Sequence, residues 1–171
     1  YEIGSSLVGS EMCIRDRGLT KIAILDVDVH HGNGTQGIFY ERSDVLTVSL
    51  HGDPSEYYPF FAGYEEEVGL ANGKNFNLNF PLSRGTADIE YMRVLQKALG
   101  KIKDFKPQIL IIALGLDASE EDPLAFLALT TKGFLELGKV IASAKLPTII
   151  VQEGGYICLL YTSPSPRDSN L

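Results

Sequence analysis

The chain has 171 residues, of which 44% are hydrophobic and 22% are charged, a balance typical of one globular domain. Its formal net charge is −7 and it has no dense Lys/Arg patch, so we expect no nucleic-acid partner. No apolar run approaches the length of a membrane span, so we expect no membrane partner either. An acidic surface is compatible with a cationic substrate.

The two ends of the chain do not resemble a natural protein sequence. One short DNA string, read on its two strands, can encode both residues 7–17 and residues 158–168, and it resembles a transposase-type sequencing adapter. We therefore expect residues 1–17 and 157–171 to be adapter-like and not native, and residues 18–156 to be a partial domain from a longer gene. Both cysteines, Cys13 and Cys158, lie in these ends, so neither disulfides nor cysteine catalysis are expected.

Strands and helices alternate along the first half of residues 18–156. Hydrophobic patterning predicts a strand over 21–29, a short helix over 34–40 and a second strand over 45–50. Residues 52–73 form a long irregular stretch that is aromatic and acidic, and loops of this length are usually functional. A short strand-like piece follows over 76–80, just before Pro81.

The second half repeats this order. Residues 86–105 predict a helix with acidic residues near its start, lysines near its end and apolar residues at helical spacing: Ile89, Met92, Leu95, Leu99 and Ile102. Continuous apolar runs over 109–114 and 148–151 are typical of buried parallel strands, and residues 131–144 predict a helix between them. The β-α-β order predicts an α/β three-layer sandwich with a mainly parallel sheet and helices on both faces.

The most informative stretch is 26–34, Asp-Val-Asp-Val-His-His-Gly-Asn-Gly. If it continues the first strand, alternation places Asp26, Asp28 and His30 on one face. Burying two carboxylates and an imidazole together is costly without a bound cation. The glycines then turn the chain at the carboxyl end of the strand, where open α/β sheets bind ligands. We therefore predict a divalent metal site, with Asp26 in a supporting role behind the ligands.

A second acidic position, Asp117, follows the central buried strand. Adjacent strands would bring it to Asp28 and His30, and three protein ligands with one open position are typical of a catalytic zinc site. Asp117 taken alone is equally compatible with a helix cap or turn residue. Together with the other two residues, the metal interpretation is favoured.

Three other residues have competing interpretations. His31 faces away from Asp28 in the predicted strand, so we expect a packed or capping histidine. His51 is either an exposed loop residue or a weak site candidate at the end of a strand. Tyr156 ends the motif Glu-Gly-Gly-Tyr; beside a metal its phenol could donate a hydrogen bond to a developing oxyanion. By itself the motif is an ordinary turn with an exposed tyrosine.

Residues 26–36, the turn Gly115-Leu-Asp117 and the motif over 153–156 together resemble the histone deacetylase superfamily, in that order. Residues 49–54 (Ser-Leu-His-Gly-Asp-Pro) followed by 58–61 (Tyr-Pro-Phe-Phe) are most similar to bacterial acetylpolyamine amidohydrolases and their class II-like relatives. The resemblance covers essentially all of residues 18–156. It implies the arginase/deacetylase fold, here incomplete.

The resemblance also implies roles for individual residues. Asp28, His30 and Asp117 match the zinc ligands, and Tyr156 matches the tyrosine that polarises the scissile carbonyl. Tyr58 falls where the family lines its acyl-lysine tunnel.

Potassium is the second cofactor that the resemblance implies. Asp26, Ser49 and Leu50 match a structural potassium site near the zinc, together with the first two zinc ligands and largely through carbonyl oxygens. Phe39 and Val45 match part of a second potassium site.

The implied activity is zinc-dependent hydrolysis of an acetylated amine, acetyl-lysine or acetylpolyamine, to acetate and free amine in a cytoplasmic bacterial protein. The family uses a tandem histidine pair upstream of the first zinc motif as general base and acid. His30-His31 is not that pair, because His30 is used by the zinc. We therefore expect this chain by itself to be inactive and the parent protein to be the enzyme.

Three alternatives stay open. A non-catalytic domain could keep the metal and bind acetylated ligands. An arginase-type ureohydrolase shares the fold, although Gly32 stands where its second metal needs an aspartate. A plain structural α/β domain would leave the charged strand ends without a role. The resemblance leaves a homodimer open as well.

Overall fold

The structure of the chain, a computed structural model, describes residues 18–124 and 126–156. The strands are β1 (Ile22–Asp26), β2 (Val45–Gly52), β3 (Asn77–Leu82), β4 (Ile109–Leu114) and β5 (Thr148–Gln152). The helices are α2 (Asn33–Phe39), α3 (Asp88–Phe105) and α4 (Thr131–Ala142), with a short 3-10 turn, η1, at Ala71–Gly73. The adapter-like segments expected at 1–17 and 157–171 lie outside the described residues, and so do Cys13 and Cys158.

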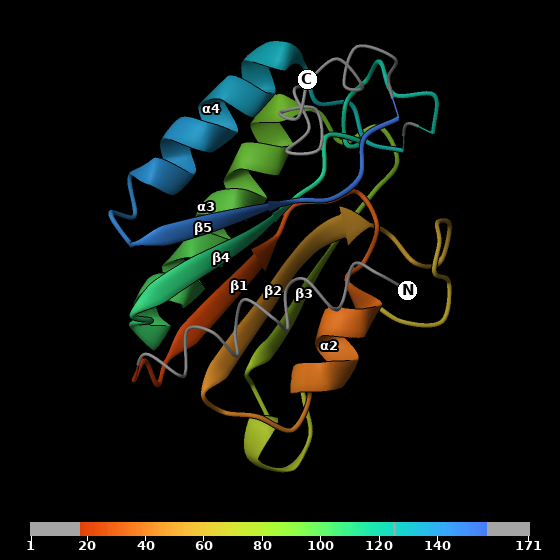
Figure 1. Cartoon of the computed structure of the whole chain (residues 1–171). Coiled ribbons are helices and arrows are strands. Elements are labelled where there is room, and N and C mark those ends of the chain that lie inside the picture. The colour runs from red at the N-terminus through yellow and green to blue at the C-terminus, as the bar shows by residue number, and fades with distance from the viewer. Residues whose placement is uncertain (1–17, 125, 157–171) are drawn as a thin grey trace, which may run out of the picture.

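The five strands form one parallel sheet in the order β3-β2-β1-β4-β5 (Figure 1). β1 lies in the middle, so its last residue, Asp26, pairs with Ser49 of β2 on one side and Ala113 of β4 on the other. Because all strands run in one direction, the loops after β1, β2, β4 and β5 leave the same edge of the sheet. The polar motifs of the sequence follow these strands, which brings them together at that edge.

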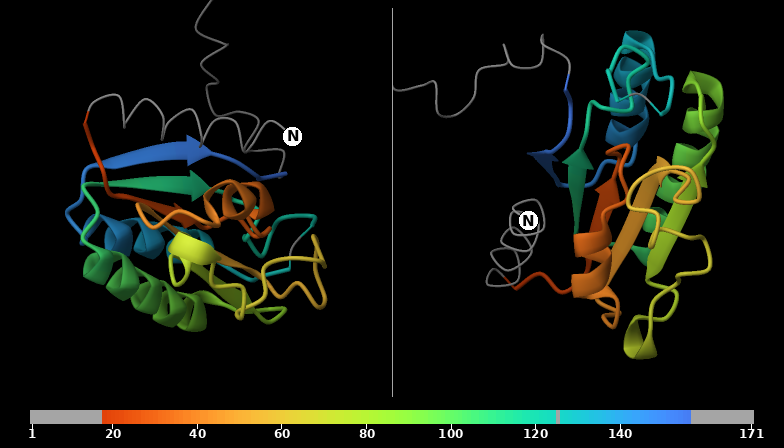
Figure 2. Two further views of the ribbon diagram at one scale, coloured as in Figure 1. Left: turned by 90° about the horizontal axis from the view of Figure 1, so that it is seen from below. Right: turned by 90° about the vertical axis from the view of Figure 1, so that its right-hand side faces the viewer.

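Helices cover both faces of the sheet (Figure 2). α3 and α4 pack on one face through the larger buried cluster, which includes Leu25, Tyr91 and Leu137. α2 lies on the other face, where Phe39 joins a smaller cluster with Ile24. The expected three-layer α/β architecture is confirmed. Among the described residues, no helix has the length and apolar character that crossing a membrane requires.

Three details of the sequence-based prediction are wrong. β1 ends at Asp26, three residues earlier than expected, so strand alternation does not extend to His30. β2 continues to Gly52, which places His51 inside the strand and not in an exposed loop. In α3, Ile89 is 90% exposed, and the helix turns Tyr91 toward the sheet instead.

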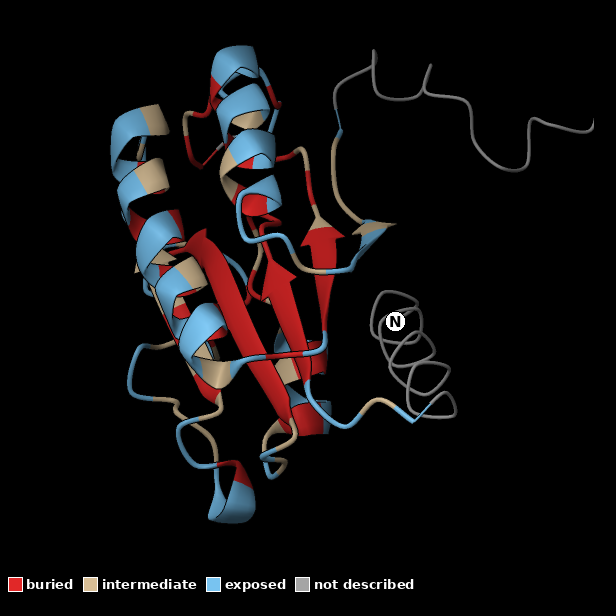
Figure 3. Ribbon diagram, turned by 90° about the vertical axis from the view of Figure 1, so that its left-hand side faces the viewer, coloured by how far each residue is buried: buried red, intermediate tan, exposed pale blue. Residues whose placement is uncertain are grey.

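β5 forms where it was predicted, but its side chains are largely exposed (Figure 3). The expectation of a buried strand is wrong for the described residues because β5 is an edge strand that pairs with β4 alone. Ile150 of β5 is 62% exposed, whereas its direct partner in β4, Ile112, is 4% exposed.

This pair gives a test of the burial pattern. In this chain, Ile112→Ala is expected to lower the free energy of unfolding by about 2–5 kcal/mol, because it removes buried methyl groups and leaves a cavity. Ile150→Ala, the same change on the paired residue, is expected to cost less than about 1 kcal/mol. Urea denaturation followed by circular dichroism measures both values. Equal losses would contradict the placement of β5 at the edge.

Candidate metal centre

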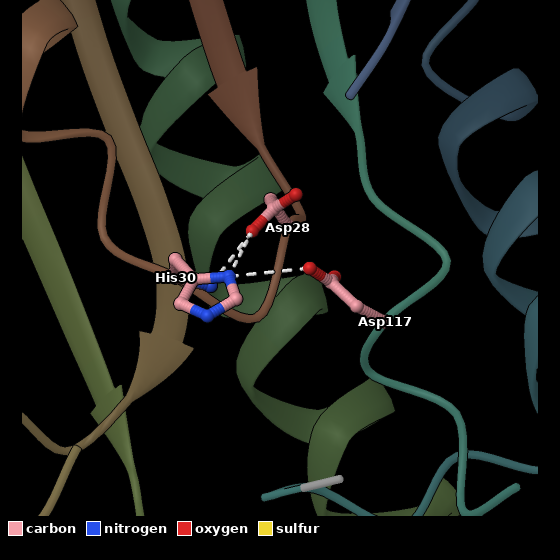
Figure 4. Close-up of side chains that lie close together, drawn as sticks. All are labelled: Asp28, His30 and Asp117. Carbon is pink, nitrogen blue, oxygen red and sulfur yellow. Dashed lines mark hydrogen bonds and ion pairs between the residues drawn. The ribbon is translucent and has the colours of Figure 1, made fainter. Parts of the chain in front are cut away.

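Three ligand-type side chains converge at the carboxyl edge of the sheet (Figure 4). Asp28 and His30 follow β1, and Asp117 follows the adjacent strand β4. One ligand atom from each lies within 4.8 Å of the other two. The Nδ1 atom of His30 is 3.0 Å from Oδ1 of Asp28 and 3.2 Å from Oδ2 of Asp117. The three residues predicted as metal ligands are thus close enough to share one cation.

Local turns after β1 place the first two of these side chains. The N–H of Asp28 donates to Oδ1 of Asp26 at 3.0 Å, and the N–H of His30 donates to Oδ1 of Asp28 at 2.8 Å. Each aspartate therefore accepts a hydrogen bond from the backbone two residues later, a pattern that replaces strand pairing with turns. Asp28 and His30 come together because the chain bends here, and not because a strand alternates.

Backbone donors from other loops fix both carboxylates. Val29 N–H donates to Oδ1 of Asp117 at 3.0 Å, and Gly154 N–H donates to Oδ2 of Asp28 at 2.9 Å. These bonds leave the second oxygen of each carboxylate directed at His30 (Figure 4). Asp117 is fully buried and Asp28 is 9% exposed, so their orientation is set by protein groups and not by solvent.

Two glycines are required by this packing. A Cβ atom on Gly115 would come within 2.6 Å of Asp117 Oδ1 and would also clash with the Asp28 carboxylate. A Cβ atom on Gly154 would come within 2.6 Å of Asp28 Oδ2 and clash with Asp117. The first glycine of the Gly-Gly pair therefore lets the β5 loop approach the two carboxylates, a role that the sequence did not indicate.

Electrostatics make the cluster receptive to a cation. Burial raises the pKa of Asp117, and the nearby charge of Asp28 raises it further. Burial also acts to raise the pKa of Asp28, but hydrogen bonds from His30 outweigh it and lower that pKa. Burial acts to lower the pKa of His30, yet its hydrogen bonds to Asp117 and Asp28 raise it to about 9. Without a metal, protonated His30 therefore serves as the counter-ion of two buried carboxylates.

The donor set fits a zinc ion. Two carboxylate oxygens and one imidazole nitrogen are ligands that Zn²⁺ accepts, and three protein ligands leave a coordination position for substrate. The side chain of His30 is 26% exposed, so the cluster can be reached from solvent. A divalent ion could replace the proton on His30 and balance both carboxylates.

Asp26 lies apart from the three ligands. It lines a small cavity on the α2 side of the sheet, together with His31, Gln36 and Ser49. Burial and the charge of Asp28 raise the pKa of Asp26 well above its ordinary value. Its one described hydrogen bond to the metal cluster is the one it accepts from the backbone of Asp28, in keeping with a supporting role.

The remaining two histidines are buried and packed together. His31 is 4% exposed, as expected for a packed histidine, and its ring centroid is 4.6 Å from that of His51. His51 donates from Nε2 to the carbonyl of Gly63 at 2.9 Å, so its Nδ1 accepts from the hydroxyl of Ser49 at 2.8 Å. Burial and the neighbouring His31 lower the pKa of His51 to about 3, so it stays neutral. His51 thus anchors the aromatic loop that follows β2.

Two tyrosines contact His30 of the cluster, and a third, Tyr156, is joined to this region through its backbone. The ring of Tyr57 stacks on His30 with centroids 5.1 Å apart, and Tyr58 meets His30 edge-on at 6.2 Å. Tyr156 is 45% exposed, and its N–H donates to Oδ2 of Asp122 at 2.9 Å. Burial, three aspartates and Tyr156 together raise the pKa of Tyr57 to about 12.

Sequence reasoning assigned no individual role to Tyr57, Asp122 or Glu153, although each lies in a stretch that it singled out. Asp122 ends an acidic run, Glu-Glu-Asp, that is typical of a solvated turn, yet it is 4% exposed. Its position before a proline gave no hint of a partner 34 residues away. The pKa of Glu153 rises to about 7 through burial and the charge of Asp28. The position of Glu153 directly before a Gly-Gly pair was the one sequence feature that pointed to this region.

Comparison with known proteins gives consistent matches. The family model described as "Histone deacetylase domain" matches residues 5–163. The chain is 47% identical over 141 residues to the acetylpolyamine amidohydrolase of Mycoplana ramosa, covering 82% of this chain and 41% of that relative. It thus spans well under half the length of this relative.

Solved structures agree with this match. The chain superposes on the crystal structure of an acetylpolyamine aminohydrolase from Burkholderia pseudomallei with a TM-score of 0.82 at 43% identity, covering 85% of this chain and 42% of the other. An HDAC homolog from Aquifex aeolicus gives a TM-score of 0.81 at 34% identity, covering 84% and 39%.

Gly154→Ala tests the glycine contact. The added methyl group would displace the carboxylates of Asp28 and Asp117, so the affinity for Zn²⁺ is expected to fall at least about tenfold, equivalent to about 1.4 kcal/mol. Competition with a chromophoric chelator measures it. Gly138→Ala is the matched control, because nothing lies within 4 Å of a Cβ atom there. Unchanged affinity in the first variant would contradict the packing described above.

The pKa of His30 predicts how stability depends on pH. A pKa raised from 6.5 to about 9 on folding contributes stability that is complete below pH 6.5 and is lost as pH rises through about 9. With a chelator present, the free energy of unfolding is expected to fall by about 2 kcal/mol over this window, after allowance for solvent screening. Urea titrations between pH 6 and 9.5 measure it. His30→Gln is expected to flatten the curve, and an equally steep curve in that variant would contradict the assignment.

Proposed function

The chain belongs to the histone deacetylase family, and from this premise we propose that it forms the zinc centre of a protein that hydrolyses acetylated amines to acetate and free amine. The convergence of Asp28, His30 and Asp117 carries the proposal. A structural domain would have no reason to bury two carboxylates beside each other, because uncompensated charge is costly in a protein interior.

Bound Zn²⁺ would polarise the acetamide carbonyl and lower the pKa of an attacking water. The chain itself supplies the groups around this reaction. Asp28 and Asp117 balance the charge of the cation, and the stacked ring of Tyr57 holds the imidazole of His30 in place. We assign to Tyr156 the donation of a hydrogen bond to the substrate oxygen, which stabilises charge that develops there.

The proposed substrate is an acetylated polyamine, with acetyl-lysine as the second candidate. The relative from Mycoplana ramosa is named for the first of these. Within the loop after β2, Tyr58 and Phe60 are 55% and 58% exposed, and Tyr58 lies next to the metal ligand His30. Aromatic faces suit both the alkyl chain and the ammonium group of such a substrate. Tyr58 is therefore proposed to line the entrance.

We also propose a potassium ion near the zinc site. Asp26 and Ser49 line the same small cavity, and a cation there would relieve the buried carboxylate of Asp26. Leu50 would contribute through its carbonyl. The second potassium site, at Phe39 and Val45, stays a prediction. The cytoplasmic location, the lack of a nucleic-acid partner and the homodimer also stay predictions.

Proton transfer at the metal is not assigned to His31 or His51. Both are buried, and their rings bond to Gln36, Ser49 and Gly63 on the α2 side. The family's tandem histidine pair fits this role, as the resemblance implies. Across residues 18–124 and 126–156 the structure brings together one three-ligand group, which favours a single metal ion over the binuclear centre of a ureohydrolase.

Two substitutions test the proposal in the longest protein that the gene encodes. Asp117→Ala is expected to lose bound zinc and activity together, because it removes a ligand. Tyr156→Phe is expected to keep zinc and to lower kcat about 100- to 1,000-fold, because it removes one oxyanion donor. Metal analysis and hydrolysis of N-acetylputrescine and an acetyl-lysine peptide measure these effects.

Asp53→Asn is the control, since Asp53 is a loop aspartate outside the metal group. Zinc retained at full occupancy in Asp117→Ala would rule out the metal site. Unchanged kcat in Tyr156→Phe would rule out the assigned role of that tyrosine, and a non-catalytic binding domain would show zinc and ligand binding without turnover.

A further inference from the structure

A continuous path of contacts joins the metal ligand His30 to the backbone of Tyr156. It runs from the ring of His30 to the ring of Tyr57, from there to Leu124, then to Asp122, and ends at Tyr156. The residues come from the loops after β1, β2, β4 and β5, so the path crosses the whole carboxyl edge of the sheet.

Tyr57 forms the first half of the path. Its ring stacks on His30 at an angle of 24°, and its other neighbour is the buried ring of Phe126, with centroids 4.5 Å apart. Its hydroxyl donates to the carbonyl of Leu124 at 3.0 Å. Gly52 allows this packing, because a Cβ atom there would clash with the ring of Phe126. Tyr57 is thus fixed at both its ring and its hydroxyl.

Asp122 forms the second half. Its Oδ1 accepts from the N–H of Leu124 at 2.8 Å, and its Oδ2 accepts from the N–H of Tyr156 at 2.9 Å. The side chain is 4% exposed, so both bonds are shielded from water. A buried carboxylate without these donors would be costly, which favours the arrangement in which both bonds are made. The same residue, Leu124, is held by Tyr57 through its carbonyl and by Asp122 through its N–H.

We propose that Tyr57 and Asp122 are positioning residues that together set where Tyr156 stands relative to the metal ligand His30. Neither is a metal ligand. Asp122 accepts a hydrogen bond from the backbone of Tyr156. Tyr57 stacks on the imidazole of His30 and bonds to Leu124, in the loop that carries Asp122. The effect of this path of contacts on catalysis rests on the proposed role of Tyr156 in deacetylation. The dependence of the Tyr156 backbone on Tyr57 and Asp122 can be measured without catalysis.

Amide hydrogen exchange, followed by NMR on this chain with and without Zn²⁺, measures the coupling. Asp122→Asn removes one carboxylate oxygen and is expected to speed exchange at the Tyr156 amide about tenfold, the effect of one lost hydrogen bond. Tyr57→Phe keeps the ring stack and removes only the hydroxyl. It is expected to speed exchange at the Tyr156 amide about threefold or more. The lost bond is to Leu124, so an effect at Tyr156 would have to pass through Asp122.

Each variant has a control that makes the same chemical change, and both controls lie in the loop after β2. Tyr64→Phe removes a tyrosine hydroxyl that donates to the carbonyl of Phe60 at 2.9 Å, and Asp53→Asn changes an aspartate that accepts from the N–H two residues later. Neither is expected to alter exchange at Tyr156. An unchanged Tyr156 amide in Tyr57→Phe would overturn the proposal. Because Tyr57→Phe deletes a single hydroxyl, the test stands even if Asp122→Asn does not fold.

A second readout uses the longest protein that the gene encodes. Tyr57→Phe is expected to lower kcat about tenfold while KM and zinc content stay within about twofold, since it disturbs the position of Tyr156 and not the binding of substrate or metal. Equal kcat in this variant and the wild-type protein would contradict the proposed effect of Tyr57 on catalysis. Wild-type protein without deacetylase activity would refute the proposed function, and the exchange result would still decide the coupling.

Discussion

The repulsion between two buried carboxylates is the constraint on which this structure depends. Asp28 and Asp117 leave adjacent strands and meet in the interior, where two negative charges cannot persist without compensation. The protein supplies part of it through backbone N–H donors and through the imidazole of His30. A cation supplies the rest, as a proton on His30 or as a metal ion in its place. The parallel order of the strands brings the two carboxylates to one edge of the sheet.

Hydrogen bonds tie the loops at this edge to one another. Gly154 of the β5 loop bonds to Asp28, and Leu116 donates to the carbonyl of Gly154 at 2.8 Å. The aromatic loop after β2 is held by His51 at Gly63, and Gln36 of α2 donates to Glu67 at 2.8 Å. Such cross-links make the ligands, the aromatic surface and the tyrosine-bearing segment one unit. Loss of one of these cross-linking bonds is therefore expected to disturb the candidate metal centre.

Much of this molecule follows from local patterns. The strand and helix order, the parallel sheet and the three residues that lie close enough to share one cation were all predictable, because hydrophobic runs and charged strand ends carry information at short range. The errors at Ile89 and β5 arise from long-range effects. Ile89 has the spacing of a core residue yet lies at the exposed start of α3, and the apolar run of β5 is exposed because pairing leaves it at the edge. Nothing in either local sequence distinguishes these outcomes.

By itself the sequence determined which side chains meet at the site, because two aspartates and a histidine stand just after buried parallel strands and their motifs carry the family resemblance. Only the tertiary structure decided how those side chains are positioned. The glycine backbone against the carboxylates and the partner of Asp122 depend on segments up to 126 residues apart. A hydrogen bond between such segments leaves no periodicity in the chain, since it is fixed by where the folded loops meet.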